Sequence, residues 1–377
     1  MNSKSLTCNW TIENSNILCL HDSELVFKDS LDHWENGLCR LMCWGDTEAK
    51  AWVEEVVKLS TNGKNTVFSK LSDREKIEIL KSATANFLKL SEPEEDKRLL
   101  GLKGPLKLLS DKIWDIGIRD KSNYAVVGSS KYEYGWLIDL LNLKAGFKTL
   151  VSYDKGYFED GDNSVGYGNY LAQKSWRAEK SNRVIKQIID ISNQIDNKLP
   201  EKVNFLDVGS SYGFMRVAAE NNGWIHDGIE LSKFACDTCK KEFGFDTFVG
   251  TIEQFLSKNH TSYNVITLLD TLEHVVDPLS MLYSVNSLLE ENGICVIRTP
   301  NLMSIEHEVF GRYYHSFKLE HIHYFSYKAM LFLLEKAGLK PLFFNSTSHL
   351  LKGFFNDDLS LFERDMKGSD LFIIAGK

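Results

Sequence analysis

Two carboxylates and two histidines form the group of side chains best suited to chemistry. Asp270, Glu273 and His274 lie within five residues directly after an apolar run, and His321 follows later in the chain. Carboxylate oxygens and imidazole nitrogens bind Mg²⁺, Mn²⁺ and similar ions. Histidine also titrates near neutrality and can accept a hydroxyl proton. The pattern leaves open a metal site at Asp270, Glu273, His274 and His321, catalysis by Asp270, His274 and His321, or simple hydrogen bonds at a turn.

Two further histidines, His315 and His323, lie close to His321 in the sequence, and Glu320 directly precedes it. A neighbouring carboxylate can orient an imidazole ring, so Glu320 is a candidate for that task. The alternative is that these rings pack at the end of a strand. Of the three histidines, we assign catalysis to His321.

A loop of small residues follows an apolar run that ends at Asp207. Glycine lacks a Cβ atom, so the backbone can approach a bound group closely, and the first N–H groups of a following helix are free to bind it. The loop predicts a ligand-binding turn, with an ordinary strand-to-helix turn as the alternative. Its candidate cofactor-binding residues are Asp207, Gly209, Ser210, Ser211, Gly213 and Phe214.

A second apolar run, 225–230, ends in the acid Glu230, which lies 23 positions after Asp207. Nucleotide-binding βαβ units place a carboxylate on the ribose hydroxyls about 20 residues after the glycine-rich turn. The spacing therefore predicts that Glu230 binds a ribose.

Strand-like runs alternate with helical periodicity through this part of the chain. Such alternation indicates an α/β fold in which helices cover both faces of a largely parallel sheet. The expected strands end at Asp207 or lie within 225–230, 246–253, 263–270 and 293–301, and the expected helices cover 171–195, 214–220 and 327–337.

These motifs, in this order, resemble the class I S-adenosylmethionine-dependent methyltransferases over residues 157–345. The resemblance implies a Rossmann-like fold, here with a mostly helical N-terminal extension, and S-adenosylmethionine as cofactor. The motifs are Leu206-Asp-Val-Gly-Ser-Ser-Tyr-Gly213, Gly228-Ile-Glu-Leu-Ser232, Leu268-Leu-Asp-Thr-Leu-Glu-His-Val-Val-Asp-Pro278, Thr299-Pro-Asn301 and Glu320-His-Ile-His-Tyr-Phe-Ser326.

The resemblance also implies roles for individual residues. Asp207 and the loop through Phe214 would line the methionine end of the cofactor, and Asp270 would lie beside the sulfonium. Ser211 replaces the middle glycine of the usual pattern, and Thr251 stands where an acid often contacts the adenine. The remaining cofactor contacts would be Glu230 at the ribose, Thr251 and Ile252 at the adenine, and also Leu231 and Tyr170.

The acid-x-x-Glu-His pattern at 270–274 resembles the metal ligands of ubiquinone-pathway O-methyltransferases and small-RNA 2′-O-methyltransferases. Those proteins usually have Glu where Asp270 stands, so this position departs from the pattern. Related enzymes without a metal carry similar residues, so a divalent ion such as Mg²⁺ and a histidine base both remain open.

The segment Gly156–Tyr170 is rich in glycine, acids and tyrosine. Similar segments precede the first motif in related methyltransferases, which favours a mobile cover over the cofactor; the alternative is an ordinary linker.

Composition narrows the class of partner. The 377 residues carry a net charge of −8, which disfavours broad nucleic-acid binding. We expect no signal peptide and no membrane span, and we expect a cytoplasmic protein with reduced cysteines. Neither Cys8, Cys19, Cys39 and Cys43 nor the pair Cys236 and Cys239 has the context of a zinc or redox site.

The N-terminal half is expected to be mainly helical. Helices are predicted over 47–59 and 74–90, the second preceded by a capping box at Ser72 and Glu75. A strand, turn, helix and strand are predicted over 124–152, with the helix at 134–143. This unit would be scaffold, substrate-binding surface or a second nucleotide site.

The expected organisation is an N-terminal region of unknown role over 1–150, a methyltransferase domain over 151–345 and a C-terminal extension over 346–377 that completes the sheet or packs on it. The expected reaction methylates a hydroxyl of a small molecule, such as a sugar or secondary metabolite. RNA 2′-O-methylation and a non-catalytic binding protein on the same fold are the alternatives.

Overall fold

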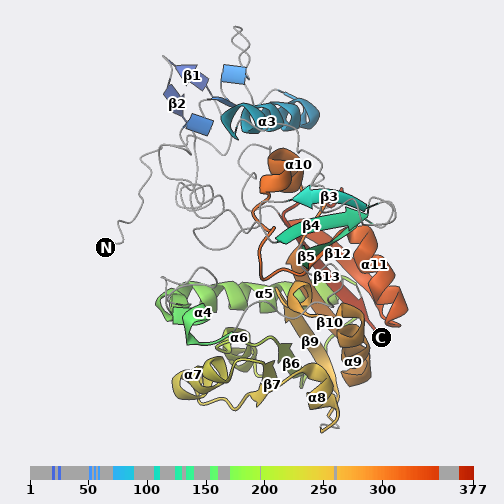
Figure 1. Ribbon diagram of the computed structural model, residues 1–377. Helices are drawn as coiled ribbons and strands as arrows, with labels where there is room; N and C mark the ends of the chain where they lie inside the picture. Colours follow the sequence, from blue (N-terminus) through green and yellow to red (C-terminus); the bar gives the residue numbers. More distant parts are fainter. Residues whose placement is uncertain are drawn as a thin grey trace.

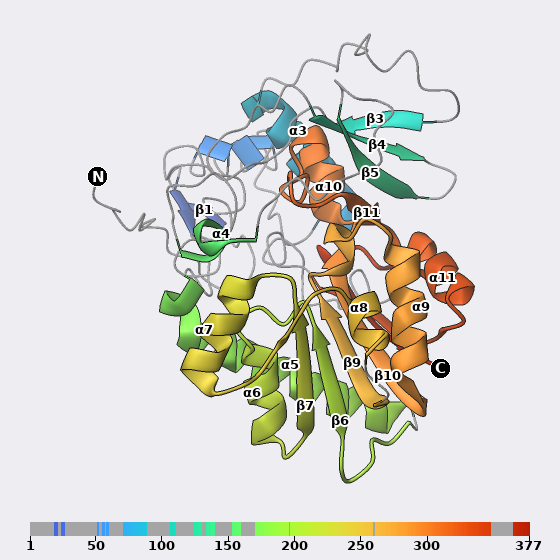
Figure 2. The same cartoon turned by 60° about the horizontal axis from the view of Figure 1, so that its bottom comes forward.

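A seven-stranded sheet forms the centre of the computed structural model (Figures 1 and 2). Its order is β12-β13-β10-β9-β6-β7-β8. The structure describes residues 19–21, 24–26, 51–52, 55–56, 58–59, 71–88, 106–110, 124–129, 133–139, 153–159, 170–195, 197–258, 261–347 and 365–377.

The five strands of this sheet that come first in the chain run parallel to one another, as expected. They are β6 (Asn204–Val208), β7 (Ile225–Glu230), β8 (Phe248–Val249), β9 (Tyr263–Leu269) and β10 (Leu289–Pro300). The last strand of the chain, β13 (Asp370–Gly376), lies between β10 and β12 (Lys340–Thr347) and is antiparallel to both. Residues from the C-terminal end therefore form part of the central sheet.

Helices cover both faces of the sheet because neighbouring strand residues point to opposite sides. Leu206 packs with α8 (Ile252–Leu256), α9 (Pro278–Leu288) and α11 (Tyr327–Lys336). Its neighbour Phe205 packs on the other face, with α5 (Lys174–Gln194) and α6 (Phe214–Asn221). This arrangement confirms the Rossmann-like α/β fold.

A smaller four-stranded sheet joins the two halves of the sequence. Its order is β11-β5-β4-β3, formed by β3 (Leu106–Ser110), β4 (Tyr124–Ser129), β5 (Tyr134–Asp139) and β11 (His323–Phe325). Strand β11 comes from the segment that carries His321, and it pairs with β5 through His323 and Trp136. The N-terminal region therefore contributes backbone partners to the neighbourhood of the candidate site.

The helix predicted over 134–143 is wrong, because residues 134–139 form strand β5. Gly135 and Leu137 are buried while Tyr134 and Trp136 are partly exposed, which is the two-residue period of a strand. Hydrogen-bonded neighbours on both sides, β4 and β11, hold this conformation. The unit is an antiparallel hairpin, and β4 does not lead into a nucleotide-binding helix.

Helix α3 (Asp73–Leu88) agrees with its prediction and packs against α10 (Ile305–Phe310). The predicted capping box is present, since Ser72 N donates to Glu75 Oε2 at 2.8 Å and Glu75 N to Ser72 Oγ at 3.4 Å. Within the expected helix 47–59, residues 51–52, 55–56 and 58–59 are described and helical.

The described cysteines behave as buried thiols. Cys236, Cys239 and Cys295 are free, and burial raises the pKa of Cys236 to about 12, which keeps the thiol protonated. Cys19 lies in β1 (Cys19–His21), which pairs with β2 (Glu24–Val26); Cys8, Cys39 and Cys43 lie outside the described residues. Over the described part of the chain, no helix is both long and apolar enough to span a membrane.

Candidate functional site

The loop after β6 has the backbone shape of a ligand-binding turn. Gly209 and Gly213 have positive φ values of 77° and 86°, and Ser211 also lies in the left-handed region at 48°. A Cβ atom on Gly209 would approach Thr271 Oγ1 to 2.6 Å. Ser211 therefore adopts a conformation that favours glycine, at a cost of about 1–2 kcal/mol. This strain is the cost of having serine in place of the glycine of the usual pattern.

Glu230 ties this loop to the end of β7. Its Oε2 accepts from Ser211 N at 2.9 Å, and its Oε1 accepts from Ser232 N at 2.8 Å. The side chain is buried, and burial raises the pKa of Glu230. The carboxylate is therefore held at the carboxyl edge of the sheet, where open α/β sheets bind their ligands.

Asp207 is buried at the end of β6, below the loop. Its Oδ1 accepts from Thr267 Oγ1 at 2.7 Å, and burial raises the pKa of Asp207 to about 6.

The predicted adenine residues begin helix α8. Thr251 is its N-cap and forms a capping box with Gln254, while Ile252 is buried. Gly250 N donates to Glu230 O at 3.0 Å, so this turn lies next to the predicted ribose acid. Leu231 is 53% exposed at the same edge and offers an apolar surface.

Tyr170 belongs to an aromatic cluster against the glycine loop. Its ring centroid lies 5.0 Å from that of Tyr212, and the Arg177 guanidinium lies 3.4 Å from the Tyr170 ring centroid. Phe158 stacks on Tyr212 with the ring centroids 5.1 Å apart. The part of the predicted cover that the structure describes therefore packs on the loop; residues 160–169 lie outside the described residues.

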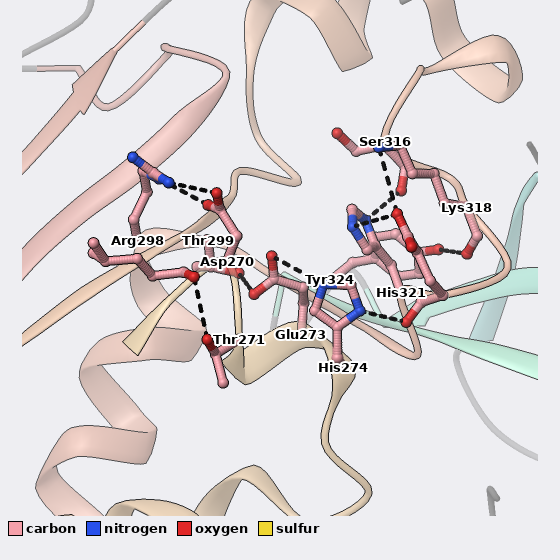
Figure 3. Close-up of polar contacts among 12 residues, drawn as sticks. Asp270, Thr271, Glu273, His274, Arg298, Thr299, Ser316, Lys318, His321 and Tyr324 are labelled. Atoms are coloured by element: carbon pink, nitrogen blue, oxygen red, sulfur yellow. Dashed lines mark hydrogen bonds and ion pairs between the residues drawn. The ribbon is translucent and has the colours of Figure 1, made fainter. Parts of the chain in front are cut away.

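Asp270 does not join the other predicted metal ligands. Its carboxylate forms a two-pronged ion pair with Arg298, whose Nε donates to Oδ1 at 2.7 Å and whose second donor reaches Oδ2 (Figure 3). Burial opposes ionisation, but the Arg298 guanidinium holds the pKa of Asp270 well below its usual range. Asp270 is thus an anion with its own counter-ion.

The structure does bring Glu273, His274 and His321 together. One ligand atom from each lies within 4.8 Å of the others, and we call this group the His/Glu cluster. Glu273 and His274 lie on the 3₁₀ helix η4 (Leu272–His274) that follows β9. A hydrogen bond from Ile322 N to Glu273 O at 2.9 Å holds the loop of His321 against it.

Backbone carbonyls set the tautomers of both histidines. His274 Nδ1 lies 2.8 Å from Glu320 O, and His321 Nδ1 lies 2.8 Å from Ser316 O (Figure 3). A carbonyl only accepts, so each Nδ1 carries the hydrogen and each neutral ring presents the Nε2 lone pair. Metal-binding histidines have this arrangement, in which the second nitrogen donates to a carbonyl or carboxylate.

Glu273 supplies an oxygen to the same space. Its side chain is 1% exposed, and Oε2 accepts from Thr299 Oγ1 at 3.0 Å. Its Oε1 lies 3.9 Å from His274 Nε2 and has no hydrogen-bond partner among the described residues. Burial and then the charge of Asp270 raise the pKa of Glu273, while burial lowers the pKa of His274 and His321. One oxygen and two nitrogens thus fit a divalent cation in donor type and placement.

His315 and His323 lie outside the His/Glu cluster. The His315 ring contacts Tyr314 with centroids 4.8 Å apart. His323 hydrogen-bonds to the Tyr134 hydroxyl and lies in β11. His323 therefore packs in a strand, and His315 is buried in the turn that precedes β11.

Arg298 was not among the predicted site residues, and Glu320 was predicted only to orient a neighbouring imidazole ring. A charged residue at the end of the buried run Cys295–Ile297 was a usable signal for Arg298. The contacts of Glu320 had no comparable signal, because they depend on how distant loops meet.

A doubly wound sheet with a glycine loop and an acid at the next strand end is the arrangement that class I S-adenosylmethionine-dependent methyltransferases share with dinucleotide-binding folds. Residues 177–342 match the family model described as a methyltransferase domain.

Two curated relatives are similar to part of the chain. The ubiquinone biosynthesis O-methyltransferase of Histophilus somni is 33% identical over 144 residues, covering 35% of this chain and 60% of the relative. That of Saccharophagus degradans is 29% identical over 139 residues, covering 35% and 58%. The chain therefore spans less than two thirds of the length of these relatives. A methyltransferase structure from Archaeoglobus fulgidus has a TM-score of 0.41 and 16% identity, covering 55% of this chain and 99% of that one.

Proposed function

We propose that the protein transfers the methyl group of S-adenosylmethionine to a hydroxyl of a small molecule, such as a sugar or secondary metabolite. The observation that carries the proposal is the His/Glu cluster, which follows β9 at the same edge of the sheet as the glycine loop. The relatives are named O-methyltransferases, which supports oxygen as the acceptor atom.

S-adenosylmethionine supplies an electrophilic methyl group on a sulfonium. We assign the ribose hydroxyls to Glu230, whose carboxylate Ser211 and Ser232 already hold in place. The exposed Leu231 and the turn at Thr251 and Ile252 would flank the adenine. The methionine end would lie on the loop residues Asp207, Gly209, Ser210, Ser211, Gly213 and Phe214, with Tyr170 beside them.

The reaction is a displacement at carbon. The acceptor oxygen bonds to the methyl carbon as the carbon–sulfur bond breaks, which leaves S-adenosylhomocysteine and releases the hydroxyl proton. Holding oxygen, carbon and sulfur in line can contribute up to roughly 7–11 kcal/mol. Asp270, kept ionised by Arg298, would face the sulfonium.

The proton of the acceptor would leave at the His/Glu cluster. His321 Nε2 carries a lone pair in the neutral ring and is the candidate base. A divalent cation on Glu273, His274 and His321 is the second possibility, and it would lower the pKa of a nearby hydroxyl. In either case these side chains take the place of water around the reacting oxygen.

The first test is calorimetric titration of the protein with S-adenosylhomocysteine. We expect binding that Glu230→Ala weakens by about 10- to 100-fold, the range for losing a hydrogen bond to a charged group. Glu253→Ala, on the exposed side of α8, is the matched control and should bind like the wild type. Failure of the wild type to bind would contradict the cofactor assignment.

A methyl-transfer assay with hydroxyl-bearing small molecules then separates the two proton routes. Chelator should abolish turnover, and Mn²⁺ should restore it, if a cation acts. If chelator has no effect while His321→Ala lowers turnover across pH 6–9, the histidine acts alone. If neither chelator nor His321→Ala changes turnover, the His/Glu cluster takes no part in the reaction.

A further inference from the structure

One short segment contacts both parts of the candidate site. Tyr153 and helix α4 (Lys155–Glu159) precede residues 177–342, which match the methyltransferase family model. Phe158 stacks on Tyr212 of the glycine loop at 5.1 Å, and the rings of Tyr153 and His274 form a T-shaped pair at 6.4 Å, both measured between ring centroids. The segment therefore spans from the loop to the His/Glu cluster.

Tyr157 makes the polar contact of this segment with the cluster side. Its hydroxyl donates to Glu320 Oε2 at 2.9 Å. The backbone oxygen of Glu320 accepts from His274 Nδ1 at 2.8 Å, and its Oε1 lies 4.0 Å from His321 Nε2. Glu320 thus touches both histidines, and Tyr157 reaches them through it.

The segment has little stability of its own. A helix of five residues is too short to persist without tertiary contacts, so its position depends on Tyr212 at one end and Glu320 at the other. A ligand that orders either contact reduces the entropy lost when the second ligand binds.

We infer that Tyr157 is a positioning residue that couples cofactor binding on the glycine loop to cation binding at the His/Glu cluster. The inference rests on the proposed function and adds a regulation to it: each ligand strengthens the binding of the other. Thermodynamic linkage requires the same factor in both directions.

The test is calorimetric titration of the full chain with S-adenosylhomocysteine and with Mn²⁺, each alone and each with the other at saturation. In the wild type, each ligand should lower the Kd of the other by the same factor, at least about fivefold. In Tyr157→Phe, each ligand alone should bind within about twofold of the wild type, and the coupling factor should fall close to one.

Three further variants control the experiment. Glu320→Gln retains an oxygen that accepts from Tyr157 and should keep most of the coupling. Glu320→Ala retains the backbone oxygen for His274 but removes that acceptor, and it serves as the test if Tyr157→Phe does not fold. Tyr283→Phe, on the exposed side of α9, should couple like the wild type.

The possible failures are distinct. If the wild type binds both ligands without coupling, or if Tyr157→Phe keeps the full factor, the inference is wrong and the proposed function stands. If Mn²⁺ does not bind, the inference falls together with the cation route. If S-adenosylhomocysteine does not bind, the proposed function itself falls with it.

Discussion

Asp270 and Arg298 form a two-pronged ion pair between the ends of the adjacent strands β9 and β10. Asp270 has a positive φ of 55°, and its N–H donates to Arg298 O at 2.9 Å. Backbone strain at a non-glycine residue persists where the surroundings over-determine it. The ion pair thus holds the Asp270 carboxylate beside the His/Glu cluster, where it binds Arg298 and is not one of the cation ligands.

Arg298→Leu should destabilise the protein at neutral pH. The loss should be about 1–2 kcal/mol, because Asp270 is 37% exposed and water screens the pair. Since Arg298 depresses the pKa of Asp270, the stabilisation is present above the unfolded pKa of about 3.9 and is lost as pH falls below it. Urea unfolding of both proteins at pH 7 and pH 3.5 checks this, and a difference that grew on acidification would contradict the assignment.

In the ligand-free protein, the contribution of Asp207 to stability should fall as pH rises, which is opposite to that of Asp270. Its folded pKa of about 6 lies above the unfolded value, so the folded state binds the extra proton between about pH 4 and 6. Stability should therefore fall by roughly 2 kcal/mol as pH rises through this range. Asp207→Asn should remove that slope, as measured by urea unfolding from pH 4 to 8; an unchanged slope would assign it to another group.

Gly209→Ala should lower the free energy of unfolding more than the matched substitution Gly223→Ala. Gly209 and Gly223 have similar φ values, 77° and 74°, but an added Cβ meets Thr271 Oγ1 at 2.6 Å in the first and nothing within 4 Å in the second. Gly223→Ala should cost about 1–2 kcal/mol from backbone strain alone. Gly209→Ala should exceed this and also weaken S-adenosylhomocysteine binding. Equal unfolding free energies and unchanged binding would show that the loop can move away from the added methyl group.

Tyr153→Phe and Tyr157→Phe should change the free energy of unfolding in opposite directions or by different amounts. The Tyr153 hydroxyl oxygen is buried and has no hydrogen-bond partner among the described residues, so its removal should leave stability unchanged or raise it by up to about 1 kcal/mol. The Tyr157 hydroxyl binds the Glu320 carboxylate, and its loss should cost about 1–3 kcal/mol. Thermal and urea unfolding of the ligand-free protein measure both, and a large loss in Tyr153→Phe would reveal a partner for its hydroxyl.

Each member of the His/Glu cluster should be needed for cation affinity. Glu273→Gln, His274→Ala and His321→Ala should each weaken Mn²⁺ binding by at least about tenfold while S-adenosylhomocysteine binding stays within about threefold. His315→Ala, outside the cluster, is the control for losing a histidine of the same loop. Unchanged Mn²⁺ binding in all three variants would place the ion elsewhere.

The sequence alone determined the five parallel strands of the central sheet and the loops at its carboxyl edge. Buried parallel strands leave continuous apolar runs, and a turn that approaches a ligand needs small residues, so both are visible locally around Asp207, Glu230 and Asp270. Glu273 and His274 could be found for the same reason, because they lie next to one another on one turn. The hairpin at 124–139 was harder, since Tyr134–Asp139 is a strand only in the presence of β4 and β11.

Only the tertiary structure decided which side chains contact one another at the candidate site. Asp270 was predicted to bind a metal, yet the strand next to β9 in the sheet places Arg298 at its carboxylate. His321 reaches Glu273 because Ile322 bonds to the Glu273 backbone, and Tyr157 reaches Glu320 across 163 positions of the chain. The neighbours of a residue in the sequence set its backbone conformation and its burial pattern. Strand order and loop packing decide which group lies opposite its charge, and local periodicity does not encode either of them.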